Sequence, residues 1–178
     1  MSDDLLAQFG VVGDQLPSPQ ASQHAYRKKV PGRVVHIDAD FMSYQLSAES
    51  VEELDNTNDT PRKSFEDMCH NATMAANHIR DLAGAEHYVC HLTPKGSNKG
   101  GRPAQAIQKE YQANRADREK PEFLDQIRAW IAQNLNGVAH MDQEADDGLT
   151  QAMYQYLDPR KNILYSADKD LLMAPGWH

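Results

Sequence analysis

Short apolar runs that each end beside acidic residues are the feature of this sequence that most restricts its fold. The clearest run, residues 34–37, is β-branched and leads directly into Asp38. Further strands are predicted at residues 87–92, 137–140 and 162–166, and apolar residues at helical spacing predict helices at residues 65–83, 121–135 and 145–157. This alternation predicts an α/β fold with a mainly parallel sheet.

Acidic residues follow several of these strands. In a parallel sheet the carboxyl ends of the strands meet at one edge, where ligands bind. The acidic residues expected at that edge are Asp38, Asp40, Glu144, Asp146, Asp147, Asp168 and Asp170. Like charges brought together repel, and burial raises the cost of keeping them ionised. The sequence therefore predicts bound divalent cations, and oxygen ligands favour Mg²⁺ or Mn²⁺ over zinc.

Each acidic group also has a purely structural interpretation. Asp40 stands where a side chain caps the next helix, and the acidic residues after Glu144 suit the positive end of a helix dipole. Asp168 and Asp170 are compatible with a solvated loop. Capping alone does not explain why three such clusters fall at the same end of one sheet, and this coincidence favours a cation site.

Positive charge is concentrated in one segment of an acidic protein. The 178 residues carry a formal net charge of −8, yet residues 95–120 contain seven basic side chains against three acidic ones, a local excess of four positive charges. This segregation suits a protein that binds a polyanion with one region and cations with another. The candidate DNA-binding residues are Lys95, Lys99, Arg102, Lys109, Arg115 and Arg118.

Length and composition predict one domain, residues 31–178, preceded by a peripheral arm at residues 1–30. Residues 47–63 are predicted as a polar excursion between elements. Cys69 and Cys90 form no disulfide framework, and the acidic start lacks a secretory signal. No apolar stretch approaches the length of a membrane span, so a soluble cytoplasmic protein is expected.

Four motifs resemble those of phage-type 5′–3′ exonucleases and flap endonucleases, and they occur in the same order. They are His36-Ile-Asp38-Ala-Asp40-Phe, Glu110-Tyr111-Gln-Ala-Asn114-Arg115, Glu144-Ala-Asp146-Asp147 and Ser166-Ala-Asp168-Lys-Asp170-Leu. The resemblance extends from about residue 33 to residue 178. It implies a three-layer α/β/α, PIN-like nuclease core that hydrolyses DNA phosphodiester bonds by a two-metal mechanism.

The resemblance also assigns roles to individual residues. The metal ligands would be Asp38, Glu144, Asp146, Asp147, Asp168 and Asp170. Arg115 would contact the scissile phosphate, in the segment leading into a helical arch, with Tyr111 and Lys109 beside it as catalytic residues.

Three positions depart from the family pattern. Gln112 replaces a Lys that would stabilise phosphoryl charge, and Thr93 stands where many relatives have a metal-linked Asp. The family also continues beyond residue 178 with further second-metal Asp residues and a helix-hairpin-helix that grips duplex DNA. We therefore expect a chain that binds Mg²⁺ or Mn²⁺ but cleaves DNA poorly alone. A separate chain that supplies the missing half would then be a partner, in the cytoplasm of a phage-infected bacterial host.

Other interpretations remain open from sequence. The chain is compatible with a catalytically defective DNA-binding or accessory protein, and with an RNA-cleaving PIN domain. Asp38-Ala-Asp40 also fits a haloacid-dehalogenase-like phosphohydrolase that uses Asp38 as nucleophile, although Met42 stands where those enzymes prefer Thr or Val. His87, Cys90 and His91 are compatible with zinc, but strand alternation puts Cys90 on the opposite face, so a structural role is favoured.

Overall fold

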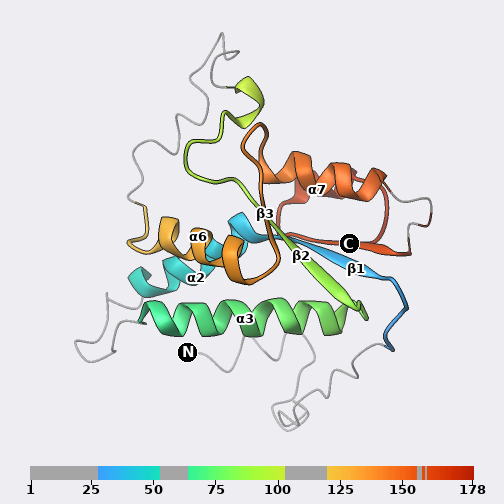
Figure 1. Cartoon of the computed structure of the whole chain (residues 1–178), viewed down its shortest axis with the longest axis horizontal. Helices are drawn as coiled ribbons and strands as arrows, with labels where there is room; N and C mark the ends of the chain where they lie inside the picture. The colour runs from blue at the N-terminus through green and yellow to red at the C-terminus, as the bar shows by residue number, and fades with distance from the viewer. Residues whose placement is uncertain (1–27, 53–63, 103–119, 156–157, 159) are drawn as a thin grey trace, which may run out of the picture.

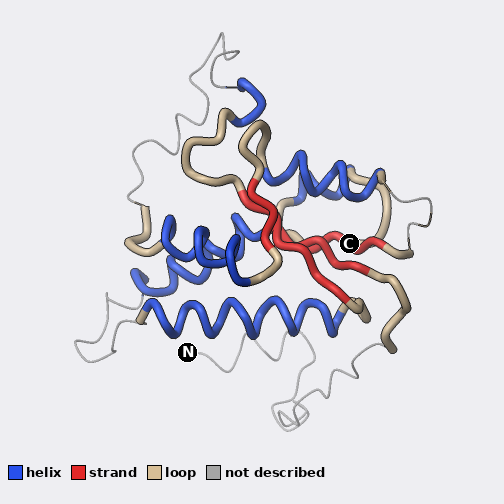
Figure 2. The backbone as a smooth tube through the Cα atoms, viewed as in Figure 1, coloured by secondary structure: helices blue, strands red, loops and turns tan. Residues whose placement is uncertain are grey.

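A four-stranded parallel sheet forms the centre of the protein (Figures 1 and 2). The computed structural model describes residues 28–52, 64–102, 120–155, 158 and 160–178. The strands are β1 (Val34–Asp38), β2 (His87–Leu92), β3 (Gly137–Ala139) and β4 (Asn162–Tyr165). They lie in the order β3-β2-β1-β4, and every pairing is parallel. The predicted α/β class and parallel sheet are confirmed.

Helices cover both faces of this sheet, an arrangement compatible with three α/β/α layers (Figure 1). Helices α2 (Ala39–Glu52), α3 (Phe65–Leu82) and α6 (Leu124–Asn134) lie on one face. Helix α7 (Ala145–Tyr154) lies on the other. Two short 3-10 helices, η3 (Lys99–Gly101) and η4 (Lys169–Met173), follow β2 and β4.

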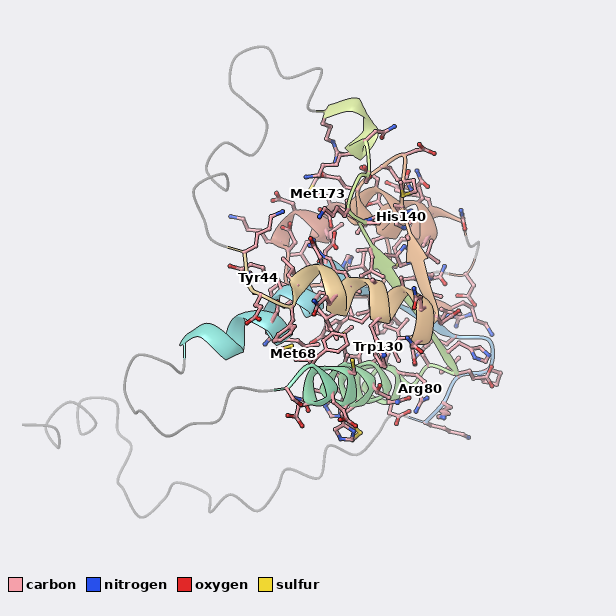
Figure 3. The ribbon with its side chains drawn as sticks, turned by 60° about the vertical axis from the view of Figure 1, so that its left-hand side comes forward. Tyr44, Met68, Arg80, Trp130, His140 and Met173 are labelled. Atoms are coloured by element: carbon pink, nitrogen blue, oxygen red, sulfur yellow. The ribbon has the colours of Figure 1, made fainter. Side chains whose placement is uncertain are left out.

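The larger hydrophobic core lies between the sheet and helices α2, α3 and α6. Alternate residues of a strand point to opposite faces, so Val35 and Ile37 of β1 enter this core. Their buried partners from the other elements are Met68, Ala72, Ala76, Ile79, Cys90, Leu92, Ile127, Ile131 and Leu135. Trp130 packs against this core from the side where α6 meets α3 (Figure 3). The three helices therefore form one apolar layer with this face of the sheet.

The α7 face of the sheet is covered by a much smaller apolar cluster. It consists of Leu149, Met153, Leu164, Leu171 and Ala174. The remaining buried positions on this face of β1, β2 and β4 are polar: His36, Asp38, His91 and Asn162. Apolar packing alone therefore fixes only part of the position of α7.

Helix α2 corrects one prediction. It continues to Glu52, so residues 47–52, expected in a polar excursion, are helical. Part of its buried side is made of serine: Ser43 and Ser47 are fully buried, and their hydroxyl groups donate to the carbonyl oxygens four residues earlier. A serine whose hydroxyl group donates to a carbonyl oxygen of its own helix can lie on a buried helix face. Because serine is polar, however, it interrupts the apolar periodicity from which a helix is predicted.

Local capping rules account for the start of α3 and the end of the α6 segment. Ser64 accepts a hydrogen bond from the Asp67 amide, and the Asp67 carboxylate accepts one from the Ser64 amide, which forms a capping box before α3. Helix α6 begins at Leu124 rather than at the predicted residue 121, because Pro121 lies in the preceding turn. Asn136 ends the α6 segment in the left-handed region at a φ of 48°.

The difference in burial between the central and edge strands gives a stability test. Ile37 in β1 is fully buried, whereas Ile163 in the edge strand β4 is only partly buried. We expect Ile37→Ala to lower the free energy of unfolding by about 3–5 kcal/mol, because it leaves a cavity in the larger core. The same change at Ile163 removes the same atoms and serves as the matched control, with a clearly smaller loss. Urea unfolding measures both, and equal losses would contradict the described core.

Candidate functional site

Asp38 anchors the carboxyl edge of the sheet. It is the last residue of β1 and is 5% exposed. One carboxylate oxygen accepts a hydrogen bond from the amide of Phe41 at 3.0 Å, and the other accepts from the Ser166 hydroxyl at 2.7 Å. The first contact gives a hydrogen-bond acceptor to a backbone amide in the first turn of α2, which has no acceptor within the helix. The second joins the end of β1 to the residue that follows β4. The cap-type contact considered for Asp40 is therefore made by Asp38.

Asp40 lies beside the same edge but is held by different partners. Its carboxylate forms an ion pair with Arg128 of α6 at 3.1 Å and accepts hydrogen bonds from the Thr93 amide. Burial raises the pKa of Asp40, and Arg128 and the Thr93 hydrogen bonds oppose this change. The Thr93 hydroxyl also accepts from the Ala145 amide at 2.9 Å. Thr93 therefore joins the end of β2 to α2 and to the start of α7, a role that its strand-end position alone did not reveal.

Arg102 bridges two acidic residues at the start of α7. Its guanidinium group pairs with Glu144 and with Asp147, the second contact at 2.7 Å. Asp147 also accepts a hydrogen bond from the Glu144 amide, as a capping residue does. Arg102 is one of the predicted DNA-binding residues, and the structure shows that it is the counter-ion of this acidic turn.

The loop that carries Arg102 is attached to the segment before α7. The Ser97 hydroxyl donates to the carbonyl oxygens of Met141 and Gln143, and the Asn98 amide donates to Met141. Gly100 has a φ of 66°, which brings its amide to the Asp142 carbonyl oxygen at 3.1 Å. Backbone contacts therefore place the basic loop directly beside the acidic turn.

The fourth strand delivers Asp168 and Asp170. Asp168 begins η4 and accepts a hydrogen bond from the Asp170 amide at 2.9 Å. Its own amide donates to Ser166, the residue that also contacts Asp38. Asp170 is exposed, and it is not among the groups that raise the pKa of Asp146.

Asp146 is a carboxylate whose negative charge none of these contacts offsets. It lies half-buried in the first turn of α7, and it makes no hydrogen bond or ion pair with any residue that the structure describes. The pKa of Asp146 is raised to about 6, most of all by burial and in addition by the charges of Asp38, Asp168, Glu144 and Asp40. Carboxylates from β1, α7 and the segment after β4 therefore act on Asp146 together.

The arrangement of these side chains is not a finished coordination shell. Within the described residues, no group of three or more His, Cys, Asp or Glu side chains is placed to hold a metal ion. The hydrogen bonds and ion pairs given above direct most of the carboxylates toward protein partners. Oxygen-only donors and surplus negative charge suit a hard divalent cation, but three ligands would have to turn toward a common point.

The other predicted site residues fall into two groups. Lys109, Tyr111, Arg115 and Arg118 lie outside the described residues. Lys95 is exposed and 3.8 Å from Asp125 of α6, and Lys99 lies in η3 at a φ of 51°. As expected from strand alternation, Cys90 points into the larger core while His91 faces the α7 side.

No family model, curated protein or solved structure matches this chain. A search of the described helices for a stretch long and apolar enough to cross a membrane finds none.

The raised pKa of Asp146 predicts a pH-dependent effect of Asp146→Asn. The unfolded chain releases the Asp146 proton at the ordinary pKa of 3.8, whereas the folded protein keeps it up to a pH of about 6. Between these two pH values, ionisation of Asp146 therefore lowers the free energy of unfolding. After allowance for solvent screening, we expect Asp146→Asn to raise the free energy of unfolding by about 1–2 kcal/mol near pH 8, in buffer with a chelator. Near pH 4 the substitution should have little effect. An equal effect at both pH values would show that the pKa of Asp146 is not raised in the folded protein.

Proposed function

We propose that this chain is a divalent-cation-dependent nuclease that hydrolyses DNA phosphodiester bonds, with Mg²⁺ or Mn²⁺ as cofactor. The observation that carries the proposal is the uncompensated carboxylate of Asp146, which lies among four other carboxylates at the carboxyl edge of a parallel sheet. A structural capping role does not require this accumulation of negative charge, whereas a cation site does. The motif resemblance supports the 5′–3′ exonuclease and flap endonuclease class and a PIN-like core.

The residues that would hold the cation come from three elements. Asp38 at the end of β1, Asp146 and Glu144 at the start of α7, and Asp168 after β4 contribute to the shared negative field. The motif resemblance adds Asp147 and Asp170. When bound, a divalent cation in such a site lowers the pKa of a water molecule and offsets charge on the leaving oxygen.

The remaining residues of the edge would bind and orient the substrate. Arg102 already neutralises Glu144 and Asp147, and its side chain stays about two-fifths exposed, at 39%. A guanidinium group binds phosphate in a two-pronged manner, so Arg102 would transfer to the DNA backbone when a cation takes its place on the carboxylates. Lys95 and Lys99 on the same loop add positive charge beside the acidic edge.

The phosphohydrolase alternative receives less support from the site. In that mechanism the second Asp of the Asp38-Ala-Asp40 pair must exchange protons with substrate. Here Asp40 is occupied by Arg128 and by the Thr93 amide, on the side of the α6 layer. A DNA-binding protein without catalytic activity would share all the features described. Only a cleavage assay therefore distinguishes it from a nuclease.

Cation binding is the first test of the proposal. We expect the full chain to bind Mn²⁺ by electron paramagnetic resonance titration, and Asp146→Asn to weaken binding at least about ten-fold, because a ligand is lost. Asp142→Asn removes an exposed acidic side chain from the loop before α7 and is the matched control, with a change within about two-fold. Absence of Mn²⁺ binding by the unmodified chain, or equal weakening by both variants, would refute the proposed site.

Cleavage separates the remaining functions. With Mg²⁺ or Mn²⁺ present, we expect slow release of nucleotides from a 5′-labelled duplex or flap, and its loss in Asp38→Asn. Vigorous cleavage would show that the expected weakness of the isolated chain is wrong. DNA binding with no cleavage under any condition would favour the accessory role. Hydrolysis of a phosphomonoester, with beryllium fluoride trapped on Asp38, would favour the phosphohydrolase.

A further inference from the structure

Three histidines from different segments form a continuous hydrogen-bonded chain beneath α7. His36 of β1 contacts His91 of β2 through ring nitrogens 3.0 Å apart, and the other nitrogen of His91 lies 2.9 Å from His140, just after β3. His36 and His91 are buried, at 6% and 5% exposure. Figure 3 shows His140 on the far side of the sheet from α3. The proposed chemistry uses none of these three rings.

Both ends of this chain return to α7. At one end, His140 Nδ1 lies 3.1 Å from the Gln143 side-chain nitrogen, and Gln143 pairs with Gln151 of α7 at 2.8 and 3.2 Å. At the other end, His36 Nε2 lies 3.4 Å from Asn162 Oδ1, and the Asn162 amide donates to the Ala152 carbonyl oxygen of α7 at 3.2 Å. The chain is thus a belt that passes under the helix and crosses β1, β2 and the segment after β3.

One proton arrangement satisfies every contact of the belt. Asn162 donates its amide hydrogen to Ala152, so its oxygen must accept from Nε2 of His36. A neutral imidazole has a single N–H, so Nδ1 of His36 accepts from Nε2 of His91. The same reasoning makes Nδ1 of His91 accept from Nε2 of His140.

The opposite end of the belt requires the same arrangement. Nδ1 of His140 accepts from the Gln143 amide, so all three rings are neutral Nε2–H tautomers. Burial, with the neighbouring His36 and His140, lowers the pKa of His91 to about 3, which agrees with a neutral ring.

Gly148 connects the belt to the acidic turn of α7. A Cβ atom at this position would lie 2.2 Å from the His140 ring, so the ring rests directly on the helix backbone. Gly148 donates its amide hydrogen to the Glu144 carbonyl oxygen, one turn earlier, and this turn carries Asp146 and Asp147. The position of the His140 ring therefore determines where the acidic turn lies relative to β1.

We propose that the His36–His91–His140 belt positions the first turn of α7 against β1, and thereby sets the spacing of the carboxylates that bind the cation. His91 is the central positioning residue, because both of its ring nitrogens belong to the belt. This inference rests on the proposed cation site, but the arrangement of protons within the belt does not depend on that site.

The first measurement is nuclear magnetic resonance of the ring nitrogens in the full chain, labelled with ¹⁵N, near neutral pH. The chain contains eight histidines, and we expect His36, His91 and His140 to show the neutral Nε2–H pattern with slowly exchanging ring protons. An Nδ1–H tautomer or a positively charged ring at any of these three positions would overturn the proposal.

The second measurement compares Mn²⁺ affinity in folded variants. His91→Phe keeps the ring volume but removes both hydrogen bonds, and we expect affinity to fall about ten-fold, as when a supporting partner of a metal ligand is lost. Gly148→Ala displaces His140 and should act in the same direction; it also serves if His91→Phe does not fold. Ile131→Ala, a core variant on the other side of the sheet, controls for general destabilisation and should change affinity less than about two-fold.

The outcomes separate the two proposals. If the unmodified chain binds Mn²⁺ and neither His91→Phe nor Gly148→Ala weakens that binding beyond the Ile131→Ala control, the belt does not position the site. If the unmodified chain binds no Mn²⁺, the proposed function and the positioning role both fail, and the ring-nitrogen spectra then decide only whether the belt exists.

Discussion

Repulsion among carboxylates at the carboxyl edge of the sheet is the constraint around which the α7 side of this protein is arranged. Parallel strands end at the same edge, so residues placed after β1 and β4 and at the start of α7 cannot avoid one another. Two arginines offset part of this charge: Arg102 pairs with Glu144 and Asp147, and Arg128 pairs with Asp40. Asp146 remains uncompensated, and its raised pKa expresses the surplus negative charge. Such a surplus is costly without a cation and favourable with one.

The two faces of the sheet are held by different kinds of interaction. Apolar side chains join β1 and β2 to α2, α3 and α6, as in an ordinary hydrophobic core. On the α7 face, buried His36, His91 and Asn162 replace much of that apolar contact. Hydrogen bonds are directional, whereas apolar contacts tolerate small displacements, so a polar layer defines the position of α7 more narrowly. This is the helix whose first turn carries the acidic residues.

Much of the fold was predictable because it depends on local pattern. The strands were recognised from short apolar runs, and the acidic edge was expected from the topology of parallel strands. Helix α2 was not among the helices predicted by residue range, because Ser43 and Ser47 are buried while Phe41 and Tyr44 are 41% and 46% exposed, which reverses the usual apolar pattern. The resemblance to exonucleases and flap endonucleases stays a prediction.

The contacts of the site depended on information that the sequence does not contain. Arg102 was assigned to DNA from its charge, but its ion pairs follow from the way the 94–102 loop hydrogen-bonds to backbone carbonyl oxygens before α7. Every residue has a backbone carbonyl oxygen, so the residue types in the sequence do not show which of these oxygens accept hydrogen bonds. The histidine belt requires β1 beside β2 and β2 beside β3, a strand order that spacing along the chain does not specify.

The most direct test of the proposed cation site is anomalous diffraction from crystals of the full chain soaked in Mn²⁺. We expect one strong manganese peak at the carboxyl edge, bounded by oxygen atoms of Asp38 and Asp146, with Arg102 displaced from Glu144. A peak remote from Asp38 and Asp146, or no peak in crystals that diffract well, would contradict it.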